Sequence, residues 1–333
     1  EKLIAIKSGR AKIIIGTHAL ISDDVEYKNL TLAVIDEQHR FGVQQRDALK
    51  NKGKFVDIIA MSATPIPRTL SMTMYGDMDV SVINEKPAGR LPIVTSKISS
   101  TRILELVERL KNKIAAGEKV FWVCPLVDET AESDYADAES RAKFLREHFA
   151  DVGMVHGRMT KPARDEIMAR FADKNSGMNI LVSTTVIEVG IDVPSATIMV
   201  VENAERFGLS ALHQLRGRVG RNDLQSFCIL MFGNHITEIG AKRLDALCKT
   251  DDGFEIAETD LMLRGVGELL GIRQSGWIKY HFADPFSHRD IFKLANRDAR
   301  ELLDADPELK SDKGAFARQM IRIFNSADAE IKN

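Results

Sequence analysis

Short apolar runs recur along the chain, and polar stretches with helical periodicity separate them. The runs are KIIIG at 12–16, LAVID at 32–36, DIIAMS at 57–62, VFWVC at 120–124, NILVS at 179–183, TIMVV at 197–201 and FCILMF at 227–232. Nearly continuous apolar runs of this length, alternating with longer helical segments, are typical of strands buried in parallel sheets. The pattern therefore predicts an α/β fold.

The segment EKPAGRLPI, residues 85–93, predicts a domain boundary, because its prolines and its glycine interrupt both the strand and the helix periodicity. A length of 333 residues suits two core domains and an appendage. We therefore expect domains at residues 1–88, 89–235 and 236–333.

Beyond residue 235 the strand pattern stops and helical patterns replace it. ITEIGAKRLDALCK at 236–249 and FEIAETDLMLR at 254–264 predict two helices joined by the turn TDDG. A glycine-rich loop and then a helical tail are expected after this hairpin.

Composition excludes some classes of function. Apolar residues make up 44% of the chain and charged residues 28%, as in a soluble globular protein. The formal net charge of -2 gives no sign of a nucleic-acid partner, so such a partner must be inferred from local motifs. The cysteines, Cys124, Cys228 and Cys248, lack metal-ligand spacing and favour a reducing, cytoplasmic setting.

Two carboxylates, Asp36 and Glu37, directly follow the run LAVI. In open α/β sheets, ligands bind at the carboxyl ends of the strands, where one acid suits Mg²⁺ and the other suits activation of a water. An isolated Asp-Glu pair is more often a polar turn, so the interpretation depends on the other motifs. The acidic stretch at 128–139 is better explained as a solvated loop and the start of a helix than as a metal cluster.

Two further motifs carry polar groups that suit phosphate chemistry. SATPIPRTL at 62–70 places Ser62 and Thr64 after another predicted strand, beside prolines that stiffen the chain. HQLRGRVGR at 213–221 holds Arg218 and Arg221, which share one face if this segment is helical and can then bind one anion. A solvated basic face is the alternative.

In this order, the motifs resemble motifs II, III and VI of superfamily 2 helicases. GTHAL at 16–20 is similar to motif Ib, and STTVIEVGIDVP at 183–194 is similar to motif V. DEQHRFGVQQR, SATPIPRTL, ERFGLSALHQLRGRVGR and TDDGFEIAETDLMLRGVGELLGIRQSG most resemble the RecG family of ATP-dependent DNA helicases, which remodel branched DNA. Transcription-repair coupling factors share SATPIPRTL but typically read DEEQRFGV, so Gln38, His39 and QSG at 274–276 favour RecG.

The resemblance implies tandem RecA-like domains with parallel sheets, followed by a C-terminal helical hairpin and tail. It implies ATP and Mg²⁺ as cofactors and branched double-stranded DNA as partner. Asp36 would bind Mg²⁺ and Glu37 would be the catalytic base. The remaining implied nucleotide-site residues sense the γ-phosphate, bind the nucleotide or act as arginine fingers: Gln38, His39, Ser62, Thr64, Asp192, Gln214, Arg218 and Arg221.

The resemblance also implies contacts with the DNA backbone by Thr17, His18, Thr184 and Thr185. Residues 236–276 are similar to the family's translocation motif, in which Arg264 and Gln274 would be supporting residues. Val266 stands where the family often has proline, so the resemblance does not fix the path of this loop.

No GxxxxGK[ST] phosphate loop occurs in the sequence, and the chain begins at Glu1 without a targeting segment. We therefore expect a C-terminal portion of a helicase, with its first RecA-like domain truncated and with no wedge domain. Such a chain would have negligible ATPase activity by itself. The alternative from another class is a nucleotide-independent DNA-binding or docking module.

Overall fold

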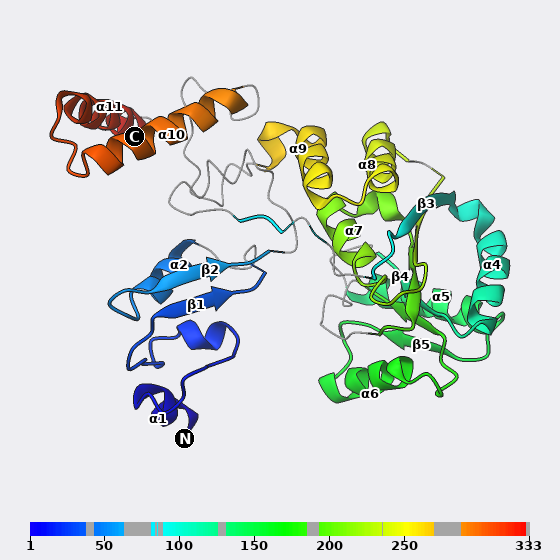
Figure 1. The fold of residues 1–333 in the computed structure, drawn as a ribbon. Helices are drawn as coiled ribbons and strands as arrows, with labels where there is room; N and C mark the ends of the chain where they lie inside the picture. Colours follow the sequence, from blue (N-terminus) through cyan, green and yellow to red (C-terminus); the bar gives the residue numbers. More distant parts are fainter. Residues whose placement is uncertain are drawn as a thin grey trace. The chain divides into compact units, whose positions relative to one another are not determined.

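The computed structural model describes residues 1–37, 43–62, 81–83, 85, 89–125, 131–184, 193–234, 236–269 and 288–330 (Figure 1). The chain forms two compact units, Glu1–Pro65 and Ile66–Asn333, and each is described by itself. Among the described helices, none combines the length and the apolar character needed to cross a lipid bilayer. The domain limits expected at residues 88 and 235 stay predictions.

The first unit is built around two parallel strands. Its elements are α1 (Lys2–Lys7), the 3-10 helix η1 (His18–Ile21), β1 (Leu32–Ile35), α2 (Val43–Lys50) and β2 (Asp57–Ala60). Leu32 pairs with Asp57 and Ile35 with Ala60, so the strands run in register over their whole length. The strands predicted at LAVID and DIIAMS are confirmed.

The strand predicted at KIIIG is wrong. Residues 12–16 have no strand structure, and Ile13 and Ile15 are 84% and 93% exposed. A β-rich run becomes a strand only where a neighbouring strand accepts its hydrogen bonds and a packed layer covers its side chains. Within the described residues, β1 and β2 pair with each other and not with this run.

The second unit holds a six-stranded sheet in the order β3-β8-β7-β4-β6-β5. Its strands are β3 (Val94–Ser99), β4 (Lys119–Val123), β5 (Val152–Val155), β6 (Ile180–Ser183), β7 (Ala196–Val201) and β8 (Phe227–Phe232). All neighbouring pairs are parallel. The four apolar runs predicted in this unit match β4, β6, β7 and β8, which confirms the α/β fold.

Helices cover both faces of this sheet (Figure 1). The described helices of the whole unit are η3 (Ser100–Arg102), α4 (Ile103–Ala115), α5 (Ala131–Arg146), α6 (Lys161–Ala172), η5 (Ala204–Arg206), α7 (Leu209–Arg216), α8 (Glu238–Lys249), α9 (Gly253–Leu269), α10 (Arg289–Ala305) and α11 (Asp312–Glu330). Alternate residues of the central strand β4 enter two separate cores. Phe121 and Val123 pack with residues of α6, α7 and α8, whereas Val120 and Trp122 pack with residues of α4 and α5.

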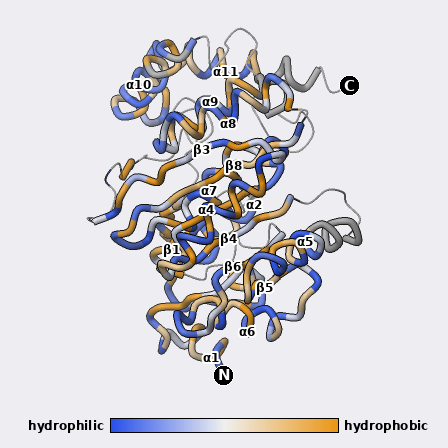
Figure 2. The backbone as a smooth tube through the Cα atoms, turned by 90° about the vertical axis from the view of Figure 1, so that its right-hand side faces the viewer, coloured by the Kyte–Doolittle hydropathy of each residue, from blue (hydrophilic) through white to orange (hydrophobic). Residues whose placement is uncertain are grey.

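Burial on both faces explains why the central strands read as continuous apolar runs, which Figure 2 colours as hydrophobic. The edge strands β3 and β5 were not predicted. VTSKIS of β3 is mostly exposed or half-buried, and VGMV of β5 is only four residues long with a glycine inside. The sequence signal of β3 is therefore weak because few of its side chains are covered, whereas β5 is mostly buried but too short to stand out.

The C-terminal helices agree largely with expectation. The predicted helical hairpin corresponds to α8 and α9, and the predicted helical tail contains α10 and α11. Helix α9 continues to Leu269, so residues 265–269, which we expected to open a glycine-rich loop, are helical. Glycine costs a helix only about 1 kcal/mol per residue relative to alanine, and the favourable helix formers around it offset this.

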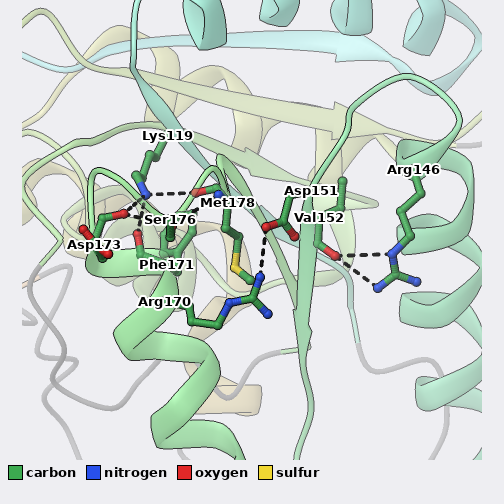
Figure 3. A network of polar contacts seen from close by, with 9 residues as sticks. All are labelled: Lys119, Arg146, Asp151, Val152, Arg170, Phe171, Asp173, Ser176 and Met178. Carbon is green, nitrogen blue, oxygen red and sulfur yellow. Dashed lines mark hydrogen bonds and ion pairs between the residues drawn. The ribbon is translucent and has the colours of Figure 1, made fainter.

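A buried lysine ties the amino-terminal end of β4 to the connection between α6 and β6 (Figure 3). Lys119 is 1% exposed, and its Nζ donates to the carbonyls of Phe171, Asp173 and Met178 at 2.8, 2.8 and 2.9 Å. Burial lowers the pKa of Lys119, although Asp173 and Asp151 oppose this shift. The ammonium thus donates hydrogen bonds to three backbone carbonyls that lie where the regular hydrogen bonding of helix and strand ends.

Candidate functional site

Three of the candidate residues lie at one edge of the first unit's sheet. Asp36 and Glu37 directly follow β1, and Ser62 lies two residues beyond the end of β2. Because Ile35 pairs with Ala60 and the Met61 amide donates to the Ile35 carbonyl at 2.8 Å, both segments leave the sheet together. The carboxyl ends of parallel strands are where α/β proteins bind ligands, so the sheet gathers acid and hydroxyl groups at a suitable edge.

The turn after β1 has an unusual backbone conformation. Glu37 has a φ of 52°, in the left-handed region that residues other than glycine rarely occupy, and its amide donates to Asp36 Oδ1 at 2.8 Å. Such conformations cost free energy and cluster at functional sites, where neighbouring structure imposes them. Asp36 is exposed and Glu37 is half-buried, so the two carboxylates have different surroundings.

The oxygen ligands at this edge of the sheet suit a hard cation such as Mg²⁺, provided that other groups supply most of its ligands. Asp36 offers an exposed carboxylate, which is the ligand type that Mg²⁺ prefers. Within the described ranges, no group of three His, Cys, Asp or Glu side chains could hold a metal ion. A magnesium ion at Asp36 would need further oxygen ligands, for which water is suited.

Several predicted site residues lie outside the described residues: Gln38, His39, Thr64, Thr185, Asp192 and Gln274. The backbone of Arg264 belongs to α9, but its side chain is outside the description. The roles of all these residues stay predictions.

The helix expected to carry Arg218 and Arg221 ends before them. Helix α7 stops at Arg216, and Gly220 has a φ of 77°, which a continuing helix does not allow. A Cβ at Gly220 would lie 3.0 Å from Ile93, so this position also needs the small residue. The shared helical face predicted for the two arginines is therefore wrong, and both lie in an irregular segment that starts with a tight turn.

The buried face of α7 determines on which side of the helix Gln214 lies. Leu209, Leu212 and Leu215 are buried in the main core of the second unit, whereas Gln214 is only partly buried. Core packing of one helix face therefore leaves Gln214 on the side away from the most buried positions.

Arg216 is the residue that sequence reasoning missed. It is 2% exposed, and its Nη1 donates to the carbonyls of Leu247 and Thr250 at 3.0 and 2.9 Å. Its Nη2 lies 2.9 Å from His213 Nδ1, and burial lowers its pKa. A signal was present, because position 216 continues the buried stripe of Leu209 and Leu212 at helical spacing.

The candidate DNA-contacting residues have different environments. Thr17 and His18 are exposed at the start of η1. Thr184 directly follows β6 and is buried, with its amide donating to the Val155 carbonyl at 3.4 Å. Exposure suits a backbone contact by Thr17 and His18, whereas burial makes Thr184 better suited to supporting its neighbours.

Comparison with known proteins adds independent information about these segments. Residues 1–73 match the DEAD/DEAH box helicase family, and residues 101–223 match the helicase conserved C-terminal domain. Residues 250–330 match the family described as ATP-dependent DNA helicase RecG, domain 3, C-terminal. Together these matches span most of the chain.

Two similar curated proteins are both named ATP-dependent DNA helicase RecG. The chain is 46% identical over 316 residues to the ATP-dependent DNA helicase RecG of Pasteurella multocida, covering 92% of this chain and 45% of that protein. It is 43% identical over 333 residues to the RecG of Bacillus subtilis, covering 99% of this chain and 48% of that protein. The chain thus spans about half the length of the curated relatives it matches.

A solved structure supports the same comparison. The structure of RecG bound to a three-way DNA junction matches with a TM-score of 0.66 and 42% sequence identity. The match covers 88% of this chain and 37% of that one.

Proposed function

Because this chain belongs to the RecG family of ATP-dependent DNA helicases, we propose that it forms part of a motor that hydrolyses ATP and moves on branched double-stranded DNA. The observation that carries the proposal is the identity of 43% to 46% with RecG proteins across nearly the whole chain. The similar structure that holds a three-way junction supports branched DNA, as in stalled forks and Holliday junctions, as the partner. Such a motor serves DNA recombination and repair.

Hydrolysis would start at the edge after β1. Glu37 would orient and deprotonate the attacking water as general base, and Asp36 would hold Mg²⁺. Bound Mg²⁺ would neutralise charge on the phosphate oxygens. The half-buried setting of Glu37 and the exposed setting of Asp36 support this division of roles.

The other nucleotide-site residues would recognise ATP and respond to its γ-phosphate. Arg218 and Arg221 stabilise charge on the transferred phosphoryl group, a role worth roughly 10³ to 10⁵ in rate. Gln38, His39, Ser62 and Thr64 sense the γ-phosphate, while Gln214 and Asp192 help bind the nucleotide. The position of Ser62 at the same sheet edge as the acids supports its part in this assignment.

Movement on DNA would involve exposed residues of the first unit and the hairpin of the second. Thr17, His18 and Thr185 contact the DNA backbone, and the buried Thr184 holds that segment in place. Arg264 and Gln274 support the hairpin formed by α8 and α9. A DNA substrate, together with cysteines that form no disulfide with one another, supports a cytoplasmic location.

The test is ATP hydrolysis by the intact gene product with and without a three-way DNA junction. Glu37→Gln should lower DNA-stimulated turnover by about 10²-fold or more, because it removes the general base. Glu26→Gln is a matched control, since Glu26 is an exposed carboxylate of the same unit, 2.6 Å from Lys7. Unchanged turnover in Glu37→Gln would remove the assignment, and junction binding without any hydrolysis would favour a docking module.

A further inference from the structure

We propose that Arg216 is a positioning residue that couples the helicase domain to the C-terminal segment of this chain. The proposal rests on the proposed function, because it concerns how ATP turnover is converted into movement. Arg216 lies within the helicase C-terminal match, residues 101–223, and one of its acceptors, Thr250, is the first residue of the RecG domain 3 match. One side chain therefore bridges the two modules.

The contact lies at the end of a helix, where carbonyl groups lack intrahelical partners. Helix α8 ends at Lys249, and Arg216 donates to Leu247 in its last turn and to the cap residue Thr250. The carboxyl end of a helix carries partial negative charge, so a guanidinium is well matched to it. The following turn leads directly into α9 at Gly253.

Apolar packing already holds these helices together, and Arg216 adds hydrogen bonds to it. Leu212 and Leu215 of α7, Leu247 of α8 and Ile256 of α9 belong to one buried cluster, and Figure 1 shows the three helices grouped together. Hydrophobic contact is not directional, whereas a planar guanidinium with two fixed acceptors is. Arg216 therefore adds a directional restraint on where the hairpin turn lies relative to α7.

Arg216 directly precedes the turn that holds Arg218, and this position links its contact with α8 to the nucleotide site. Arg216 is the last residue of α7, and Arg218 follows in the turn, with the Arg218 amide donating to the Leu215 carbonyl at 3.0 Å. When nucleotide binding displaces this turn, the guanidinium passes the displacement to the backbone at Leu247 and Thr250. Because Arg216 is buried, losing these bonds would leave polar groups without water to replace them, at a cost in free energy.

The local part of the proposal is tested by amide hydrogen exchange on this chain. Arg216→Met keeps much of the length of the side chain but removes both donors, so amides in residues 250–256 should exchange roughly tenfold faster. Arg216→Lys should give a smaller increase, since an ammonium keeps the charge but not the planar fork. Lys97→Met is the control, because it removes the 2.5 Å ion pair of Lys97 with Asp245 that ties α8 to β3 elsewhere.

The functional part uses the intact gene product and measures base pairs of junction DNA unwound per ATP hydrolysed. In Arg216→Lys and Arg216→Met this ratio should fall roughly tenfold, while hydrolysis keeps its wild-type order of magnitude. Lys97→Met should leave the ratio unchanged. A purely structural role would lower hydrolysis and unwinding by the same factor, and that result, or an unchanged ratio, would overturn the proposal.

The two proposals fail in different ways. If the wild-type protein hydrolyses no ATP with junction DNA, the proposed function fails and the coupling role fails with it. If wild-type hydrolysis and unwinding are normal and the Arg216 variants keep the wild-type ratio, only the coupling role fails. Where Arg216→Met does not fold, Arg216→Lys decides between these outcomes.

Discussion

Replacing Lys119 by methionine gives the most direct test of how the second unit's sheet is held at its amino-terminal edge. The side chain is 1% exposed and donates to the carbonyls of Phe171, Asp173 and Met178. Methionine has a similar length but no donor, so the fold would keep its packing and lose these three bonds. The variant therefore isolates the polar contribution of the ammonium.

The expected loss can be worked from the acceptors. Asp173 keeps the hydroxyl of Ser176 as a donor at 2.9 Å, so the carbonyls of Phe171 and Met178 dominate the cost. A buried acceptor left without a donor costs about 1–3 kcal/mol, which gives about 2–6 kcal/mol for the two. Since burying an ammonium is itself unfavourable, part of this cost is offset, and we expect a net loss of about 3 kcal/mol.

The assay is urea-induced unfolding followed by tryptophan fluorescence. Trp122 is fully buried in β4, the same strand as Lys119. A Trp277→Phe background leaves Trp122 as the only tryptophan in the sequence, so the fluorescence reports on this strand. Lys111→Met is the control, because Lys111 forms an exposed ion pair with Glu108 and should change the free energy of unfolding by less than about 0.5 kcal/mol. A loss below about 1 kcal/mol for Lys119→Met would refute the reasoning.

Four further variants test other parts of the structure. Burial and then Arg158 lower the pKa of His156 below its ordinary value of about 6.5, so the unfolded chain binds more protons once the pH falls to that value, and stability falls on acidification. His156→Gln should flatten that fall in thermal unfolding. Arg218→Ala and Arg221→Ala should each lower DNA-stimulated ATP turnover by roughly 10³-fold while junction binding persists. Arg141→Met leaves the carboxylate of Glu202, otherwise bonded to Trp122, without its ion pair, and should cost about 3 kcal/mol in urea unfolding.

For each of these predictions, a particular result would contradict the reasoning. An unchanged pH slope in His156→Gln would assign the acid sensitivity to other groups. Normal turnover in both arginine variants would remove their role as arginine fingers. Arg109→Met, which breaks an exposed ion pair with Glu105, is the control for Arg141→Met, and an equal effect of the two would show that burial of Glu202 does not matter.

Much of the fold could be predicted from the sequence because the central strands are buried on both faces. VFWVC, TIMVV and FCILMF read as apolar runs since their residues meet packed helix layers on the two sides of the sheet. The acids at 36–37 were also predictable in place, because they directly follow an apolar run of the first unit. These features depend on short stretches of the chain and are readable without knowing what lies beside them.

The errors concern features that depend on distant residues. KIIIG has the composition of a strand but pairs with none of the described strands, and VTSKIS forms a strand because β8 lies beside it. The turn after α7 was expected to be helical, but Gly220 packs against Ile93 in a conformation that ends the helix. A local pattern does not record such neighbours.

By itself, the sequence determined the α/β class, the central strands, the helical hairpin and the acids at a strand end. Only the tertiary structure decided that Lys119 and Arg216 are buried, and which carbonyl groups they satisfy. The physical reason is that the charge of a lysine or arginine favours water unless a set of acceptors replaces it. Those acceptors come from segments 31 to 59 residues away, so folding alone brings them together.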